Sequence, residues 1–206
     1  MEYEFNVIKK YYEEKLKVFG ANCKGLAWKN QKEVNLRYNI MLDMLYFIKK
    51  KNISLLDLGC GFGGLLQVIN KRKLSINYTG IDISPIMISE AKKKYPKNFF
   101  LCANILNKKI KKKFDFIIMN GIFTVKSKLN KEQMWDFFKK LLVESYSIAK
   151  KGISFNLMKY NLDWRRNDLF HVRYDELEKF LIKNISRKFI IRSDYPLNEF
   201  TTYVFK

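Results

Sequence analysis

The sequence is poor in cysteine, histidine and proline, and it lacks any long run of apolar residues. Its cysteines, Cys23, Cys60 and Cys102, are odd in number and show no Cys-x-x-Cys spacing, and the chain has a single histidine. Neither a disulfide framework nor a zinc site is favoured, so we expect reduced thiols and no metal. No apolar run approaches the roughly 20 residues that span a bilayer, and the N-terminus mixes acids with lysines. We expect a cytoplasmic protein that does not insert into a membrane.

Acidic residues are also scarce relative to basic ones. The chain has 40 lysines and arginines against 20 aspartates and glutamates, which gives a net charge of +20. Such an excess can indicate a polyanionic partner, because clustered lysines neutralise phosphates and release counterions. Here the lysines are scattered, and the densest cluster, residues 108–113, is typical of a solvated loop before a strand. We therefore favour a small anionic substrate over a nucleic-acid partner, and an RNA-binding protein stays as the alternative.

The spacing of apolar residues predicts one domain over residues 1–206, with helices in 1–50 and an α/β core in 51–206. Nothing marks an internal boundary, since there are no repeats and only three prolines. Two helices, from Glu2 to about Phe19 and from about Gln31 to Lys50, are expected to cover a sheet. Strands and helices then alternate, with strands expected at 54–58, 78–83, 99–103, 114–120 and 152–157, and helices near 64–71, 85–94 and 131–149.

The alternation of strands and helices ends in the last third of the chain. A helix is expected around residues 174–183, and two runs rich in aromatic and β-branched residues, 187–195 and 200–205, flank Pro196-Leu197-Asn198. This pattern predicts a terminal antiparallel hairpin, whereas the alternation before it predicts a mostly parallel, doubly wound sheet that binds ligands at the carboxyl ends of its strands. The combination resembles the Rossmann-like α/β fold of class I methyltransferases, which implies a seven-stranded sheet.

The segment from Leu55 to Gly64, LLDLGCGFGG, is an apolar strand that runs into a glycine-rich turn and opens a helix. It satisfies the G-x-G-x-x-G dinucleotide pattern, which alone is a weak signal. Asp57 lies two residues before the first glycine, where its charge suits a cationic ligand better than a pyrophosphate. Asp-x-Gly-x-Gly at a strand end resembles the first motif of the S-adenosylmethionine-dependent methyltransferases. A turn without a ligand and a nicotinamide-dependent oxidoreductase are the alternatives.

This resemblance implies S-adenosylmethionine as cofactor and S-adenosylhomocysteine as product. The cofactor-binding residues expected in the first motif are Asp57, Gly59, Cys60, Gly61 and Gly63.

Two further strand ends continue the pattern. Asp82 follows the glycines by about twenty residues, where it can accept hydrogen bonds from both ribose hydroxyls, and Ile83 and Met87 would flank the adenine. The alternative is that Asp82 caps a helix. The segment with Asn104 and Ile105 resembles the one that usually offers an aspartate to the adenine amino group, so Asn104 is expected to accept that hydrogen bond without charge.

The fourth strand ends at Asn120 and Gly121, where methyl transfer occurs in the superfamily. The resemblance therefore places both residues at the cofactor and Phe123 at the acceptor. Asn120 and Phe123 share their spacing with the Asn-Pro-Pro-Phe/Tyr signature of nucleic-acid amino methyltransferases. Both prolines are absent here, which argues against an enzyme that modifies adenine.

Nearly the whole chain resembles a small bacterial methyltransferase family often found near surface-polysaccharide genes. The resemblance implies O-methylation of a small, anionic or nucleotide-sugar acceptor in capsule biosynthesis, the O-methyl phosphoramidate modification included, and leaves the acceptor and the oligomeric state open. The segments that carry it are residues 19–28 (FGANCKGLAW), 36–38 (LRY), 120–123 (NGIF), 154–156 (SFN), 170–171 (FH) and 193–196 (SDYP).

Arg37 precedes the glycine turn by about twenty residues, as does the arginine that grips the cofactor carboxylate in the similar quinone-biosynthesis O-methyltransferases. A bidentate guanidinium suits that function, and a helix-surface arginine is the alternative. Trp28 is expected either to line the cofactor pocket or to anchor the N-terminal segment.

Methyl transfer from a sulfonium depends mainly on alignment of donor and acceptor. A base matters if the acceptor is a hydroxyl, whose proton must leave around the time of attack. His171 is the candidate, because its unperturbed proton affinity suits neutral pH and it follows the fifth strand, where class I enzymes commonly build the acceptor site; a structural role is the alternative. The further expected substrate contacts are Tyr11, Tyr12, Asn156, Tyr160 and Arg173.

Overall fold

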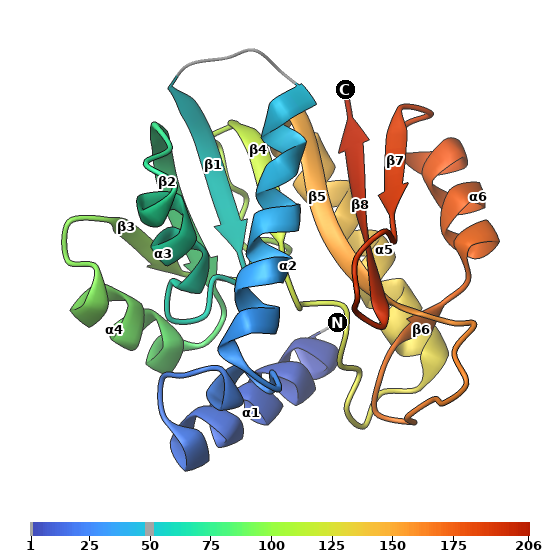
Figure 1. Ribbon diagram of the computed structural model, residues 1–206, viewed down its shortest axis with the longest axis horizontal. Helices are drawn as coiled ribbons and strands as arrows, with labels where there is room; N and C mark the ends of the chain where they lie inside the picture. Colours follow the sequence, from blue (N-terminus) through green and yellow to red (C-terminus); the bar gives the residue numbers. More distant parts are fainter. Residues whose placement is uncertain (1, 48–51) are drawn as a thin grey trace.

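The protein folds around one mixed β-sheet, seen in a computed structural model that describes residues 2–47 and 52–206 (Figure 1). The strand order is β3-β2-β1-β4-β5-β8-β7, and β6 pairs with β5 off this path. The strands are β1 (Ile53–Leu58), β2 (Ile76–Asp82), β3 (Phe99–Cys102), β4 (Phe114–Met119), β5 (Ala149–Lys159), β6 (His171–Val172), β7 (Phe189–Arg192) and β8 (Glu199–Phe205). The helices are α1 (Glu2–Phe19), η1 (Lys24–Leu26), α2 (Gln31–Asp43), η2 (Met44–Phe47), α3 (Gly64–Lys71), α4 (Pro85–Lys94), α5 (Lys131–Ile148) and α6 (Tyr174–Asn184).

The directions of the strands confirm the predicted doubly wound sheet with a terminal hairpin. The strands β1 to β5 pair in parallel, whereas β8 is antiparallel to both β5 and β7. The expected number of strands was wrong, because the described chain forms eight rather than seven. The additional strand, β6, has two residues that pair with Met158 and Lys159 of β5. A strand of two residues is too short to show an alternating pattern in the sequence.

The two faces of the sheet are covered by different helices. Successive residues of β1 point to opposite sides, so Leu55 packs with the apolar side chains of α2 and α3, and Leu56 packs with those of α5 and α6. In Figure 1, α2 crosses in front of the sheet and α5 lies behind it. The strand β4, at the centre of the sheet, is buried along its whole length.

The helix starts follow their capping residues. The side chain of Asn30 accepts a hydrogen bond from the Glu33 amide at the start of α2, and Ser84 accepts from Met87 at the start of α4. The helix expected over residues 31–50 is shorter than predicted. It ends at Asp43 and continues as the 3₁₀ turn η2, and residues 48–50 of that prediction lie outside the described residues.

The helix α1 lies at an edge of the sheet. It was expected to cover a face of the sheet, but it runs across the edge where the parallel strands end, as Figure 1 shows. Its contacts are with η1, α4 and α5. Phe5 packs edge-on against Phe137, with 4.9 Å between ring centroids, and Leu16 packs with Phe62 and Met87. The helix therefore closes over the edge at which doubly wound sheets bind ligands.

Three global features bear on function. Within residues 2–47 and 52–206, no helix is long and apolar enough to cross a membrane. The same residues contain no group of histidine, cysteine, aspartate and glutamate side chains arranged to hold a metal ion. All three cysteines are free thiols.

Candidate active site

A cavity lies at the carboxyl edge of the sheet, beneath α1. It holds about 890 Å³ of space, its open mouth included. Its floor is made by the residues that follow β1, β2, β3 and β4, and α1, η1 and α5 complete its walls. The strand order reverses between β1 and β4, so the cavity lies at the topological switch point of the sheet.

The glycine-rich turn after β1 brings bare backbone to the cavity. Gly61 has a φ of +52°, and a Cβ atom there would lie 3.2 Å from Leu26 of η1. A Cβ on Gly59 would come within 2.6 Å of Ile122, beyond the end of β4. The left-handed φ and these close approaches explain why glycine occupies both positions. Gly59 and Gly61 both line the cavity.

Asp82 fastens this turn to the end of β2. One carboxylate oxygen accepts from the Gly61 amide and the other from the Ser84 amide, both at 2.9 Å. Burial raises the pKa of Asp82, and the backbone hydrogen bonds oppose that shift. Each carboxylate oxygen has a second lone pair, so the side chain can still accept from a ligand. Asp82 lines the cavity, as expected for a residue that holds paired hydroxyls.

Asp57 lies beneath the turn and not in the cavity lining. It points to the same face of the sheet as Leu55, where it is 3 % exposed and accepts a hydrogen bond of 2.7 Å from the Tyr78 hydroxyl. Burial raises the pKa of Asp57 to about 7, although the hydrogen bond from Tyr78 lowers it.

The turn after β4 is held from several sides. The Gly121 amide donates to Asn156 Oδ1 at 2.8 Å, and the Gly121 carbonyl accepts from the hydroxyls of Thr124, at 3.0 Å, and Tyr12, at 3.2 Å. Gly121 has a φ of +82°, and a Cβ there would lie 2.8 Å from the ring of Trp28. This turn is therefore fixed by Thr124, three residues later, and by residues from three distant parts of the chain.

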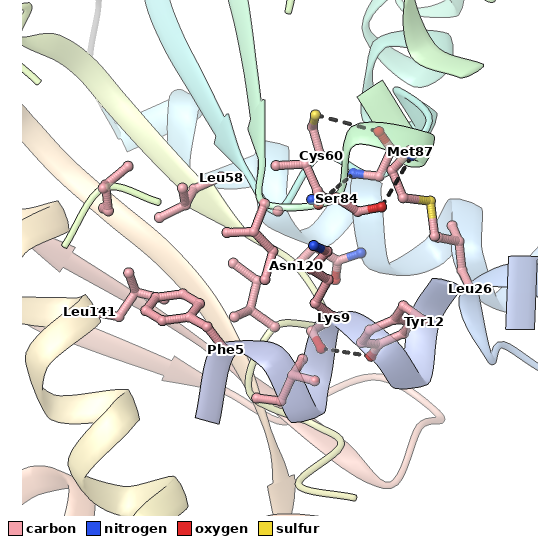
Figure 2. A pocket seen from close by; sticks show the side chains of 18 of the residues that line it. Phe5, Lys9, Tyr12, Leu26, Leu58, Cys60, Ser84, Met87, Asn120 and Leu141 are labelled. Atoms are coloured by element: carbon pink, nitrogen blue, oxygen red, sulfur yellow. Dashed lines mark hydrogen bonds between the residues drawn. The ribbon is translucent and has the colours of Figure 1, made fainter. Parts of the chain in front are cut away.

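The helix α1 forms the roof of the cavity, and the side chains that it contributes lie on one face of the helix. Figure 2 shows Phe5, Lys9 and Tyr12 reaching from α1 toward the cavity that Cys60 and Asn120 line from the sheet. The spacing of three or four residues places these side chains on one helical face. Lys9 is the one lysine or arginine among the lining residues of the described chain.

Most of the predicted cofactor residues meet in this cavity. Those that line it are Gly59, Cys60, Gly61, Asp82, Ile83, Met87, Ile105, Asn120 and Gly121. The other four do not line the cavity. Asp57 is buried beneath the turn, and Gly63 faces Tyr95 and Phe100. Asn104 accepts from the Leu106 amide, and Arg37 lies against Trp28 and Glu199.

The predicted substrate contacts are spread over several places. Tyr12 lines the cavity, and Tyr11 packs on its ring at 5.2 Å. Phe123 is fully buried in an aromatic cluster with Phe137, Phe138 and Phe155, and Asn156 is buried behind the turn after β4. These two side chains support the cavity without lining it.

The remaining candidates form a separate group near β6. His171 Nδ1 donates to the Lys159 carbonyl at 2.7 Å, which leaves the lone pair on Nε2. The guanidinium groups of Arg165 and Arg173 lie 4.4 and 5.5 Å from the centroid of the Tyr160 ring. Neither His171 nor Tyr160 lines the cavity beneath α1.

Several lining residues were not identified from the sequence. All but Ser84 are apolar or belong to helices, and little in the local sequence distinguishes them from core residues. Lys9 offered one signal, because it breaks the apolar face of α1 between Phe5 and Tyr12. The others include Phe5, Ile8, Leu26, Tyr38, Ser84, Ile122, Phe137 and Leu141.

Comparison with known proteins places the chain among methyltransferases. Residues 49–183 match the family profile described as "Methyltransferase domain". The protein named "Putative methyltransferase Rv1506c" of Mycobacterium tuberculosis (strain ATCC 25618 / H37Rv) is 30 % identical over 158 residues, which cover 74 % of this chain and 93 % of that protein. The malonyl-[acyl-carrier protein] O-methyltransferase of Acetivibrio thermocellus is 34 % identical over 41 % of this chain, and the match spans only 31 % of that relative.

Solved structures share the fold at low sequence identity. The magnesium protoporphyrin IX methyltransferase of Synechocystis PCC 6803, solved with bound S-adenosylmethionine, superimposes with a TM-score of 0.69 and 13 % identity over 98 % of this chain and 97 % of that one.

Proposed function

This chain belongs to the methyltransferase domain family, as an S-adenosylmethionine-dependent methyltransferase, and from that premise we propose that it methylates an oxygen atom of a small, anionic or sugar-linked acceptor. The acceptor enters the cavity between α1 and the turn after β4. The observation that carries the proposal is the composition of this cavity, in which one cation, Lys9, stands among mostly apolar side chains.

The cavity residues fit the cofactor. Gly59 and Gly61 leave room for a ligand to approach the backbone, and Asp82 offers free lone pairs to ribose hydroxyls. Asn120 Oδ1 is buried and has no hydrogen-bond partner within the described residues, so it is a free acceptor for a donor group of the ligand. Ile83, Met87 and Ile105 provide apolar surface for a purine. When bound, S-adenosylmethionine supplies an electrophilic methyl group on a positively charged sulfur.

The residues of this chain contribute alignment and exclusion of water. Tyr12 and Thr124 hold the Gly121 carbonyl, and Asn156 holds the Gly121 amide, so the turn beside the acceptor has a fixed shape. Phe5, Ile8 and Phe137 close the cavity with apolar surface. A preformed geometry of this kind reduces the entropic cost of bringing donor and acceptor into line.

Lys9 supports an acidic acceptor. Its ammonium group has no acidic neighbour in the cavity except Asp82, whose carboxylate is bonded to two backbone amides. A carboxylate or phosphate on the acceptor would supply the opposite charge. The relative from Acetivibrio thermocellus is named an O-methyltransferase, which favours oxygen as the atom methylated. The resemblance to methyltransferases found near surface-polysaccharide genes favours a capsule or cell-surface sugar pathway.

A hydroxyl acceptor needs a base, and His171 is our candidate. Its Nδ1 hydrogen bond to Lys159 fixes the ring and leaves Nε2 able to accept a proton. Since His171 stands outside the cavity lining, an acceptor that uses it extends from the cavity toward β6. A phosphate or carboxylate acceptor needs no base, and His171 is then structural.

The first experiment tests the cofactor site by calorimetric titration with S-adenosylhomocysteine. We expect saturable binding by the wild-type chain and an affinity reduced about 10- to 100-fold in Asp82→Ala, because charged hydrogen bonds contribute roughly 1.5–3 kcal/mol each. Asp136→Ala, which removes an exposed carboxylate on α5, is the matched control. Equal affinities in all three proteins would rule out the proposed site, and stabilisation by NADH alone would favour an oxidoreductase.

The second experiment concerns the acceptor. Methyl transfer from labelled S-adenosylmethionine is measured with panels of sugar phosphates, nucleotide sugars and small carboxylic acids, and with total RNA. The proposal predicts transfer to a member of the small-molecule panels. The net charge of +20 favours RNA as the second candidate, and transfer to RNA alone would establish that function instead.

A further inference from the structure

A buried ion pair links α2 to the C-terminal hairpin directly behind the cavity wall. Arg37 Nε lies 2.7 Å from Glu199 Oε1, and the two side chains are 9 % and 2 % exposed. Glu33, one helical turn earlier, is a weaker partner at 3.5 Å. Burial raises the pKa of Glu199, and the charge of Arg37 opposes that shift.

Arg37 contacts Trp28, which lines the cavity. Its guanidinium lies 4.0 Å from the centroid of the indole ring. The same ring lies so close to Gly121 that a Cβ there would approach to 2.8 Å. Trp28 therefore contacts both a cation and the turn after β4.

Glu199 reaches the same turn by a second route. The Glu199 carboxyl also lies close to Asn156, which lowers the pKa of Glu199 against the effect of burial. The Oδ1 atom of Asn156 accepts the Gly121 amide at 2.8 Å. The contacts form a closed ring that runs from Gly121 through Asn156, Glu199, Arg37 and Trp28 back to Gly121.

Net stability is a weak explanation for this arrangement. Removing two charges from water costs free energy that their attraction often only balances, so a buried pair adds little to stability compared with apolar residues of similar volume. A chain of packed side chains does carry coupling between its members. The member that reaches the ligand cavity is the turn at Gly121, together with the indole of Trp28.

We propose that Arg37 and Glu199 are positioning residues, which hold Trp28 and the turn after β4 in the shape that binds the cofactor. This inference rests on the proposed function. It also gives Arg37 a different role from the one expected from the sequence, because the guanidinium is engaged by Glu199 and Trp28 and does not line the cavity.

The test compares two ion pairs that both link α2 to the hairpin. Arg192 Nη1 of β7 lies 3.0 Å from Asp43 Oδ2 of α2, and neither residue lines the cavity. We expect Glu199→Gln to weaken S-adenosylhomocysteine binding about tenfold, measured by calorimetry, while Asp43→Asn binds as the wild-type protein does. Thermal unfolding of both variants reports the separate loss of stability.

A double variant keeps the test informative if Glu199→Gln alone fails to fold. Arg37→Met with Glu199→Gln removes both charges of the buried pair, so its unfolding temperature should lie closer to that of the wild-type protein. Its affinity should stay reduced, because no cation holds the indole. Wild-type affinity in the double variant, or equal losses in Glu199→Gln and Asp43→Asn, would overturn the positioning role. Absence of binding by the wild-type chain would instead contradict the proposed function.

Discussion

The cavity wall at the ends of β1 and β2 is built from short runs of neighbouring residues, whereas the wall at the end of β4 is fixed by residues from distant parts of the chain. At the first wall, the turn from Gly59 to Gly63 and the side chain of Asp82 suffice, joined by the hydrogen bond from the Gly61 amide to the Asp82 carboxylate. At the second, Gly121 depends on Tyr12, Trp28 and Asn156.

The difference follows from what each wall presents to a ligand. The first wall offers backbone, and glycine can do so without help because it adopts positive φ at little cost. The second wall offers side chains and a turn whose shape is not set by its own sequence. It therefore needs support through tertiary contacts, and substitutions far from it in the sequence should affect it.

The largest expected effect is at the first wall. Gly61→Arg places a long side chain in the cavity, since even a Cβ at this position lies 3.2 Å from Leu26. We expect no detectable binding of S-adenosylhomocysteine by calorimetry. The control is Gly20→Arg, because Gly20 also has a positive φ but no neighbour closer than 4.0 Å to its Cβ position and no place in the lining. Binding by Gly61→Arg at wild-type strength would show that the ligand lies elsewhere.

The next largest effect is on the free energy of unfolding. It concerns Asp57, the buried acid beneath the first wall. The folded-state pKa of Asp57, about 7, is raised above its ordinary value of 3.8. The folded protein then holds this proton more tightly than the unfolded chain, so stability falls as pH rises from about 4 to 7. Asp57→Asn lacks this titration and should gain stability relative to wild type over the same interval, by on the order of a few kcal/mol.

Urea unfolding at pH 5 and pH 8 measures this gain. Asp136→Asn serves as the control, because Asp136 is exposed and its pKa is lowered by Lys139. A constant difference between wild type and Asp57→Asn at the two pH values would show that Asp57 does not titrate in this range.

The smallest effect is at the second wall. Tyr12→Phe removes the hydrogen bond to the Gly121 carbonyl, which Thr124 continues to occupy. A single hydrogen bond contributes about 0.5–1.5 kcal/mol, so the affinity for S-adenosylhomocysteine should fall about two- to tenfold. Tyr11→Phe changes the neighbouring residue, which does not line the cavity, and should have no effect. Equal affinities in both variants would mean that α1 does not support the turn.

The same contrast explains how much the sequence predicted. The glycine turn and Asp82 are local patterns with fixed spacing, and they line the cavity as expected. Lys9 and Phe5 lie far from the glycines in sequence, and their place in the cavity depends on the path of α1 across the sheet edge. Periodicity identifies α1 as a helix but does not indicate what its apolar face covers.

The contacts of Arg37 could not be predicted from the sequence. Its distance from the glycine turn suggested a contact with the cofactor, but spacing along the chain does not reveal a competing partner. Glu199 lies 162 positions later and comes within 2.7 Å because β8 pairs with β5. The role of a long side chain is set by the nearest opposite charge in the folded protein, and no local pattern records it.

The most direct test of the account is a crystal structure of the protein with S-adenosylhomocysteine. We predict the ligand beneath α1, its ribose hydroxyls within hydrogen-bond distance of Asp82, and Arg37 still paired with Glu199 behind Trp28. A ligand bound outside this cavity, or an Arg37 side chain that has left Glu199 to hold the ligand's carboxylate, would contradict it.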